Sequence, residues 1–214
     1  TNSAQGESLD MLIVDTASAG IQFSGEWMGL GLRGNNSISL TMDQVQVPVS
    51  NLIGQEGEGQ ALIFEVVAPT FITGISAVNV GLARGAYEAA LNHAQSRKYA
   101  NGQSLAHVPA IQYYLADMYG QVESASLFVR NAAQEMVEGK EGAILNILQS
   151  KIIASQSAQS VTTTAMQVCG GKGYTPALPV ERFFRDARAG SVMAPTTDVL
   201  KEWVGKTVAG LPLF

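Results

Sequence analysis

Residues Gln167–Pro195 read QVCGGKGYTPALPVERFFRDARAGSVMAP, and no other part of the sequence is as distinctive. Two adjacent glycines, Gly170 and Gly171, follow a long helical pattern, and Gly173 comes one residue later. Glycines placed in this way leave the backbone bare, so that a large planar or phosphorylated ligand can approach it. The pair is also explained as a helix stop of the Schellman type, in which glycine adopts the left-handed conformation. Both interpretations end a helix at this point.

Helical patterns lie on both sides of the glycine pair. In two of the long upstream segments, apolar residues recur every three or four positions, as they do on the buried face of a helix in a bundle. Long helices are predicted at Gln60–Tyr99, with an interruption or kink at Pro69, at Pro109–Glu138 and at Ala143–Val168, and shorter ones at Val180–Arg188 and Thr197–Ala209. Three long antiparallel helices and the terminal one predict a mainly α fold, an up-and-down four-helix bundle.

The first fifty residues have a different pattern. Short β-rich runs occur at Met11–Val14, Ile21–Phe23 and Ser37–Val47, the last with apolar and polar residues in alternation. Two or three strands are too few for an independent sheet. We therefore expect a few antiparallel strands that complete a sheet begun elsewhere, either upstream in a longer polypeptide or on a partner.

Composition limits the classes of function. The chain has 46% hydrophobic and only 14% charged residues, which is typical of a globular protein with wide buried faces. A net charge of −5 argues against nucleic acid as a partner, because no excess of Lys and Arg exists to neutralise phosphates. No uninterrupted apolar run reaches the roughly 18 residues that span a bilayer, so no membrane partner is expected. The single cysteine is compatible with a reducing cytoplasm.

Few catalytic motifs are present. His93 and His107 lie on different predicted elements without nearby ligand residues, so no metal site is predicted. Arg97 at the end of a helix, the bare glycine pair and Thr196 with Asp198 at the start of the last helix are three ways to hold a phosphate or a flavin ribityl chain. Taken singly, the same residues are an ordinary helix-end charge, a turn and an N-cap.

Four segments resemble the acyl-CoA dehydrogenase flavoprotein family, and they occur in the family's order. They are GLGLRGNNSISLTMDQVQVPVSNLIGQEGEG, VGLARGAYEAALNHAQSRKYANGQSL, IQYYLADMYGQVESA and QVCGGKGYTPALPVERFFRDA. The resemblance covers about Leu9 to Val204. It implies that residues 1–56 are the end of the family's middle β-domain and residues 57–214 its C-terminal helical bundle. The family's N-terminal domain and the early β strands would be absent from this chain.

The resemblance also implies a cofactor, FAD, and residues that bind it. Arg97 matches an arginine on the FAD pyrophosphate, usually that of a neighbouring subunit. Gln167, Gly170 and Gly171 match the loop that receives the adenine end. Thr196 matches a threonine at the helix start that holds the flavin phosphates, and the next-but-one position, usually Glu or Gln, is Asp198 here. Family members are homodimers or homotetramers built through the bundle.

The chain departs from the family at the catalytic base. The family's usual Tyr-Glu-Gly-Thr segment, whose glutamate removes the α-proton of an acyl-CoA, reads Met193-Ala194-Pro195-Thr196 here. Members that carry the base on the first bundle helix have it where this chain has Thr70, Phe71 and Ile72, and only Glu65 lies nearby. Abstracting so weak an acid without a carboxylate has no obvious mechanism, and the catalytic residues are therefore unknown.

Three functions remain open. The first is the C-terminal portion of an acyl-CoA dehydrogenase-like, FAD-dependent oxidoreductase that acts on CH–CH groups, contributing FAD binding and oligomerisation. The second is a flavin-dependent monooxygenase of the same fold, which does not need the glutamate. The third is a catalytically inactive oligomerisation module. In each case we expect a cytoplasmic homo-oligomer, acyl-CoA or another small molecule as any substrate, and no retention of FAD by this chain alone.

Overall fold

The computed structural model describes residues 8–212, and these residues divide into two compact units. The first unit comprises the residues up to Gly29 together with Arg33–Thr70. The second comprises Leu30–Leu32 and the residues from Phe71 onward. The chain passes from the first unit to the second after Thr70, inside a helix. The family domain boundary expected at 56/57 stays a prediction.

Short antiparallel strands form the first unit. Strand β1 (Met11–Leu12) pairs with β4 (Leu52–Ile53), and β2 (Ile21–Ser24) pairs with β3 (Ser39–Met42). The long strand predicted to reach Val47 ends at Met42, because Asp43 N–H donates to the Gly20 carbonyl (2.9 Å) and Gln44 turns the chain with a φ of +47°. A 3₁₀ turn, Val49–Asn51, precedes β4. Apolar side chains of β2 and β3 stay exposed, as expected of a two-stranded sheet.

The first helix changes type along its length. Helix α1 (Gly59–Leu62) continues through a π-helical turn, Ile63–Val67, into α2 (Ala68–Ser96). The interruption predicted at Pro69 is this turn, which lies just before the proline. Proline lacks the N–H that would bond the carbonyl four residues earlier, and its ring presses on that carbonyl. The wider turn, in which Ala68 N–H donates to the Ile63 carbonyl, accommodates both effects.

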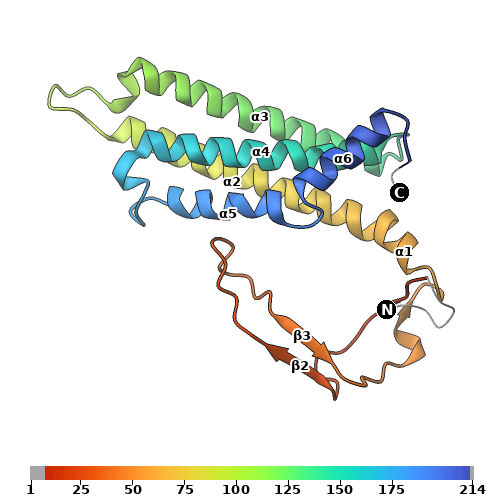
Figure 1. Ribbon diagram of the computed structural model, residues 1–214. Coiled ribbons are helices and arrows are strands. Elements are labelled where there is room, and N and C mark those ends of the chain that lie inside the picture. The colour runs from red at the N-terminus through yellow and green to blue at the C-terminus, as the bar shows by residue number, and fades with distance from the viewer. Residues whose placement is uncertain (1–7, 213–214) are drawn as a thin grey trace. The chain divides into compact units, whose positions relative to one another are not determined.

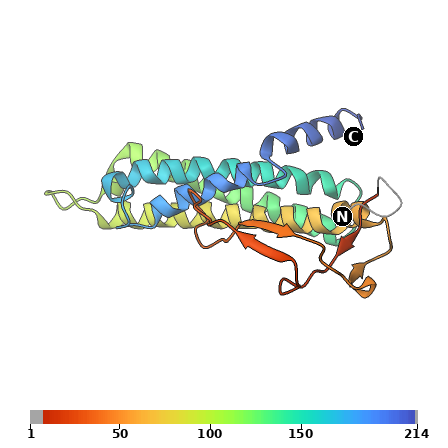
Figure 2. The same cartoon turned by 60° about the horizontal axis from the view of Figure 1, so that its bottom comes forward.

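The remaining helices form the second unit with α2. Helices α3 (Pro109–Val137), α4 (Ala143–Cys169), α5 (Val180–Val192) and α6 (Thr197–Val208) follow along the chain. Figures 1 and 2 show α2, α3, α4 and α5 side by side with alternating directions, which is the predicted up-and-down bundle. One detail differs: the fourth helix of the bundle is α5, whereas the terminal α6 lies across the end of α4 and α5.

Small residues set the spacing of the bundle. Ala83, Ala86, Ala90 and Ala94 form the buried side of α2, and they pack against apolar residues of α3, α4 and α5. A Cβ added at Gly85 would come within 2.9 Å of the Phe183 ring, so α2 and α5 approach closely there. Gly85 therefore permits close packing of the two helices at this position.

Helix α5 also holds a segment of the β-rich half of the sequence. Leu32 N–H donates to Asp186 Oδ1 (2.7 Å), and Arg185 Nη1 donates to the Leu30 carbonyl (2.9 Å). A Cβ at Gly31 would lie 2.4 Å from the Arg185 carbonyl oxygen. The RFFRDA part of the distinctive segment therefore has a structural role, anchoring residues 30–32 to the bundle.

Helix α2 and the turns before it have an apolar outer face. Within residues 8–212, the helical stretch Gly59–Ser96 is the one long and apolar enough to cross a membrane by length and composition. The sequence prediction considered only uninterrupted apolar runs and did not find it. The inner face of α2 packs into the bundle core, and 17% of the apolar stretch is buried within the described part of the chain.

Candidate functional site

Arg97 lies directly after α2, at the end of the bundle where α4 also ends (Figure 1). Its backbone is fixed, because its N–H donates to the His93 carbonyl (2.9 Å) and its own carbonyl accepts from Leu105 N–H (2.8 Å). The exposed guanidinium lies 5.8 Å from the centre of the Tyr99 ring and forms no ion pair within residues 8–212. The positive charge is therefore held in place and open to an anion.

The glycine pair forms an open bend after α4. Gly170 has φ +55° and ψ −142°, a conformation that glycine adopts at little cost. The bend is closed by Gly173 and Tyr174, whose N–H groups both donate to the Gly170 carbonyl (2.9 and 3.2 Å). A Cβ at Gly170 or Gly171 would meet no atom within 4 Å. The prediction of bare backbone at this bend is confirmed, and Gln167 beside it is exposed.

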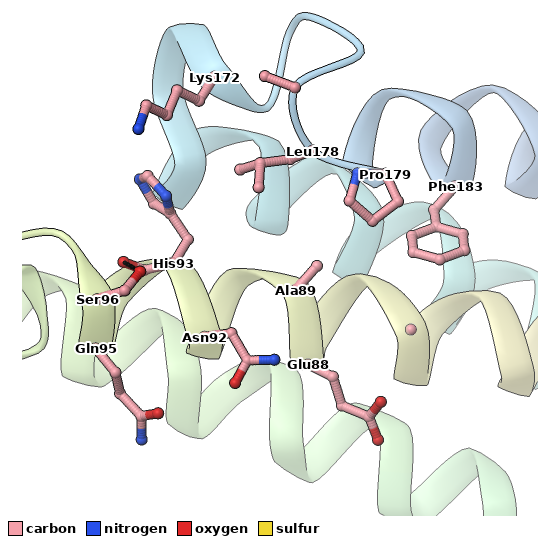
Figure 3. A pocket seen from close by; sticks show the side chains of 12 residues that line it. Glu88, Ala89, Asn92, His93, Gln95, Ser96, Lys172, Leu178, Pro179 and Phe183 are labelled. Carbon is pink, nitrogen blue, oxygen red and sulfur yellow. Dashed lines mark hydrogen bonds between the residues drawn. The ribbon is translucent and has the colours of Figure 1, made fainter.

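A cavity of about 900 Å³ adjoins this end of the bundle, between α2 and the loop that follows the glycine pair. In Figure 3 the side chains of Lys172 and His93 point toward one another across it. The polar lining comes mainly from α2, with Glu88, Asn92, Gln95 and Ser96. Leu178, Pro179 and Phe183 supply the apolar lining from the opposite side.

The charges around the cavity affect the pKa of His93. The residue is only 6% exposed, and its Nε2 is buried without a hydrogen-bond partner in the described part of the chain. Burial lowers the pKa of His93, and the positive charges of Lys172 and Arg97 lower it further. The imidazole is therefore neutral at pH 7, and both cations act on the same small volume. Arg97 and the glycine bend lie at the same end of the bundle, after α2 and α4 respectively (Figure 1).

Thr196 and Asp198 belong to a second cluster. Thr196 is the N-cap of α6, and its Oγ1 accepts from Val199 N–H (3.3 Å). Asp198 is exposed and lies 3.7 Å from the Lys201 ammonium. Helix α5 has 13 residues and separates this cluster from the glycine bend by about 20 Å at the usual rise per residue. The predicted site residues of one chain therefore lie in two separate clusters.

Ala194 lies in the turn between α5 and α6 and is exposed. Glu65 is part of the π-helical turn before α2 and belongs to the first unit. Residues 8–212 contain no group of three or more His, Cys, Asp or Glu side chains that would hold a metal. No residue is therefore assigned as the catalytic base, and the replacement of the usual glutamate by Ala194 stays a prediction.

Two lysines were not singled out by the sequence analysis. Lys172 follows the glycine pair directly in the sequence, so its position beside the predicted ligand-binding bend could have identified it. Lys151 is fully buried in α4, and nothing in its local sequence distinguishes it from an exposed lysine. Its partners are two carbonyl oxygens more than 40 residues away, so only the fold reveals its role.

Known proteins resemble this chain over most of its length. A family model described as the C-terminal domain of acyl-CoA dehydrogenase matches residues 73–209. Cyclohex-1-ene-1-carbonyl-CoA dehydrogenase of Geobacter metallireducens is 31% identical over 202 residues, covering 94% of this chain and 53% of the relative. The mitochondrial short-chain specific acyl-CoA dehydrogenase of Sus scrofa is 30% identical over 197 residues, covering 92% and 47%.

Solved structures agree with these sequence matches. Butyryl-CoA dehydrogenase from Megasphaera elsdenii has a TM-score of 0.88 at 29% identity, covering 94% of this chain and 52% of that protein. The chain thus spans about half the length of the relatives it matches.

Proposed function

Because the chain belongs to the acyl-CoA dehydrogenase family, we propose that it is the C-terminal portion of an FAD-dependent oxidoreductase. In this proposal the whole protein acts on an acyl-CoA in the cytoplasm, and this portion contributes flavin binding and subunit association. The observation that supports it best is the location of Arg97 and the open glycine bend at the same end of the bundle. The names of the relatives, all dehydrogenases of CoA thioesters, support the substrate class.

The residues present fit the anionic half of FAD. The pyrophosphate is a dianion, and Arg97 and Lys172, both exposed and both close enough to His93 to lower its pKa, offer two positive charges for it. The backbone at Gly171 has room for a planar base, since no atom occupies the space that a side chain would fill. At the other end of α5, Thr196 caps a helix whose first two N–H groups, those of Thr197 and Asp198, are open to phosphate oxygens.

FAD, when bound, would accept the hydride that leaves the substrate. The residues of this chain would bind and orient it: Arg97 and Lys172 by charge, Gln167 and Gly171 at the adenine end, and Thr196 with Asp198 at the phosphates. None of these residues supplies a base for the substrate's α-proton.

We also propose that the functional protein is a homo-oligomer. The two clusters lie at opposite ends of α5, so one flavin held at Thr196 would be completed by Arg97 and the glycine bend of a second copy. A groove of small and polar residues between α3 and α4, including Gly120, Ser124 and Ser157, offers a face on which another helix can pack. Leu127 and Tyr113 on α3 are 60% and 71% exposed, which supports a subunit contact along this helix.

A monooxygenase is the second candidate, and the alanine at position 194 favours it. Oxygen activation by reduced flavin does not require a carboxylate at this turn, whereas removal of an α-proton requires a base. The two candidates predict different behaviour toward acyl-CoA in the absence of oxygen.

The test uses the whole protein. We expect it to be purified with flavin absorbance that is bleached anaerobically by acyl-CoA. Oxygen consumption with supplied reduced flavin, without such bleaching, would favour the monooxygenase. Absence of bound flavin would contradict both proposals.

A single substitution tests the binding residues directly. We expect Arg97→Ala to weaken FAD binding by about tenfold or more, the equivalent of about 1.4 kcal/mol for one lost charge-assisted contact. Arg33→Ala is the matched control, because Arg33 is an exposed arginine outside the bundle helices whose guanidinium group contacts the Gly29 carbonyl (3.4 Å). Unchanged FAD affinity in the Arg97 variant would remove this residue from the site.

A further inference from the structure

Lys151 is a buried cation that is bound by carbonyl oxygens. Its side chain has no exposed surface, and its Nζ donates hydrogen bonds to the carbonyls of Met193 (2.8 Å) and Pro195 (2.7 Å). No carboxylate forms an ion pair with it anywhere in residues 8–212. Burying an ammonium without hydrogen bonds costs several kcal/mol, so the two carbonyls are what keeps Lys151 in this position.

These two hydrogen bonds fix the orientation of the turn between α5 and α6. In a trans peptide the carbonyl and the N–H of the next residue point in opposite directions. Lys151 draws the carbonyls of Met193 and Pro195 inward, so the N–H groups of Ala194 and Thr196 point away from it. The N–H groups of Thr197 and Asp198, the first two of α6, follow directly and have no partners within the helix, whereas Val199 N–H donates to Thr196 Oγ1.

We propose that Lys151 is a positioning residue for flavin phosphate: it holds the Met193–Thr196 turn so that its outward N–H groups and the start of α6 face the phosphate oxygens. This inference rests on the proposed function, which assigns that phosphate to Thr196. Position 194, where the family usually has its catalytic glutamate, lies between the two anchored carbonyls. The same lysine therefore sets the placement of that position as well.

A purely structural role for Lys151 makes a different prediction. If the lysine only joined α4 to the turn, its loss would lower stability without changing the FAD affinity of the molecules that remain folded. Ser150 is a matched control for this case, because it is the preceding residue on α4, is buried, and hydrogen-bonds to Ser76 (3.1 Å) without contacting the turn.

The experiment measures FAD binding by the flavin-free whole protein, below the unfolding temperature of each variant. We expect Lys151→Met to reduce FAD affinity about tenfold or more. Ser150→Ala should lower the melting temperature yet keep the affinity within about twofold. Where Lys151→Met does not fold, Lys151→Gln is the decisive variant, since it keeps an N–H donor but no charge. Wild-type affinity in the folded methionine variant, or in a glutamine variant whose turn exchanges its N–H hydrogens faster than wild type, would overturn the inference.

A second measurement does not involve flavin. Hydrogen exchange of the N–H groups at residues 194–198 should be faster in Lys151→Met than in wild type and Ser150→Ala, because the turn is released. Unchanged exchange would show that Lys151 does not hold the turn. A wild-type whole protein that binds no FAD would instead contradict the proposed function, and the two failures are thereby distinguished.

Discussion

At the scale of single residues, the protonation state of the buried His93 depends on the charges that surround the candidate site. It lies one turn before Arg97 on α2, and its imidazole is enclosed between the bundle and Lys172. Protonation of the buried His93 would place a third positive charge near those of Arg97 and Lys172. The neutral form is therefore favoured, and the folded protein resists uptake of a proton at this position.

This resistance predicts an acid-dependent loss of stability. The pKa of His93 is lower in the folded protein than its ordinary value of 6.5, so the unfolded chain binds the proton more strongly. The free energy of unfolding should therefore fall as the pH drops below about 6.5 toward the folded pKa. Urea denaturation between pH 7 and pH 5 should show a smaller loss for His93→Asn than for wild type.

His107→Asn is the control for this measurement. His107 is exposed in the turn before α3, and its variant keeps His93 in place, so the wild-type acid dependence should persist. An equal loss of stability in wild type and His93→Asn would contradict the assignment of this effect to His93.

At the scale of elements, hydrophobic periodicity predicted the long helices well. Helix α3 begins at Pro109 and α4 at Ala143, as expected, because helix boundaries there coincide with Pro and Gly residues that act locally. Helix α5 runs beyond its predicted end at Arg188 to Val192, through Gly190. A Cβ at Gly190 would lie 2.3 Å from Asn79 Oδ1, so this glycine serves close helix packing, a tertiary effect that the local sequence does not show.

A substitution in the glycine bend can change ligand affinity without changing the stability of the fold. Gly171, unlike Gly170, has no left-handed φ, and its surroundings are open. We expect Gly171→Ala to leave the free energy of unfolding within about 0.5 kcal/mol of wild type. The added methyl group would nevertheless prevent close approach of a ligand to the backbone, so FAD affinity of the whole protein should fall about tenfold.

Gly205→Ala is the matched control, because Gly205 also has open space around it but lies inside α6. It should stabilise the helix by about 0.5–1 kcal/mol and leave FAD affinity unchanged. If Gly171→Ala bound FAD as tightly as the control, the glycine bend would be only a helix stop, the alternative that the sequence left open.

At the scale of the whole molecule, the structure places the proposed flavin-binding residues in two clusters of one chain. The sequence predicted the members of both clusters, because Arg97, the glycine pair and Thr196 stand at helix ends, where charges and free backbone groups bind anions. Their separation by the length of α5 was not predictable, since it depends on how α5 packs in the bundle. Lys151 was missed for a similar reason, because its partners come from a distant turn.

Two separated clusters predict that this chain alone binds FAD poorly. Each cluster would contact only part of the cofactor, and losing two charge-assisted hydrogen bonds of about 1.5 kcal/mol each weakens binding about a hundredfold. The 214-residue chain should therefore be purified colourless, and titration with FAD should give a dissociation constant at least that much higher than the whole protein's. Far-UV circular dichroism must show a folded helical bundle in the same sample. A yellow preparation with stoichiometric FAD would mean that one chain assembles the full set of contacts, which would remove the argument for a second copy completing the site.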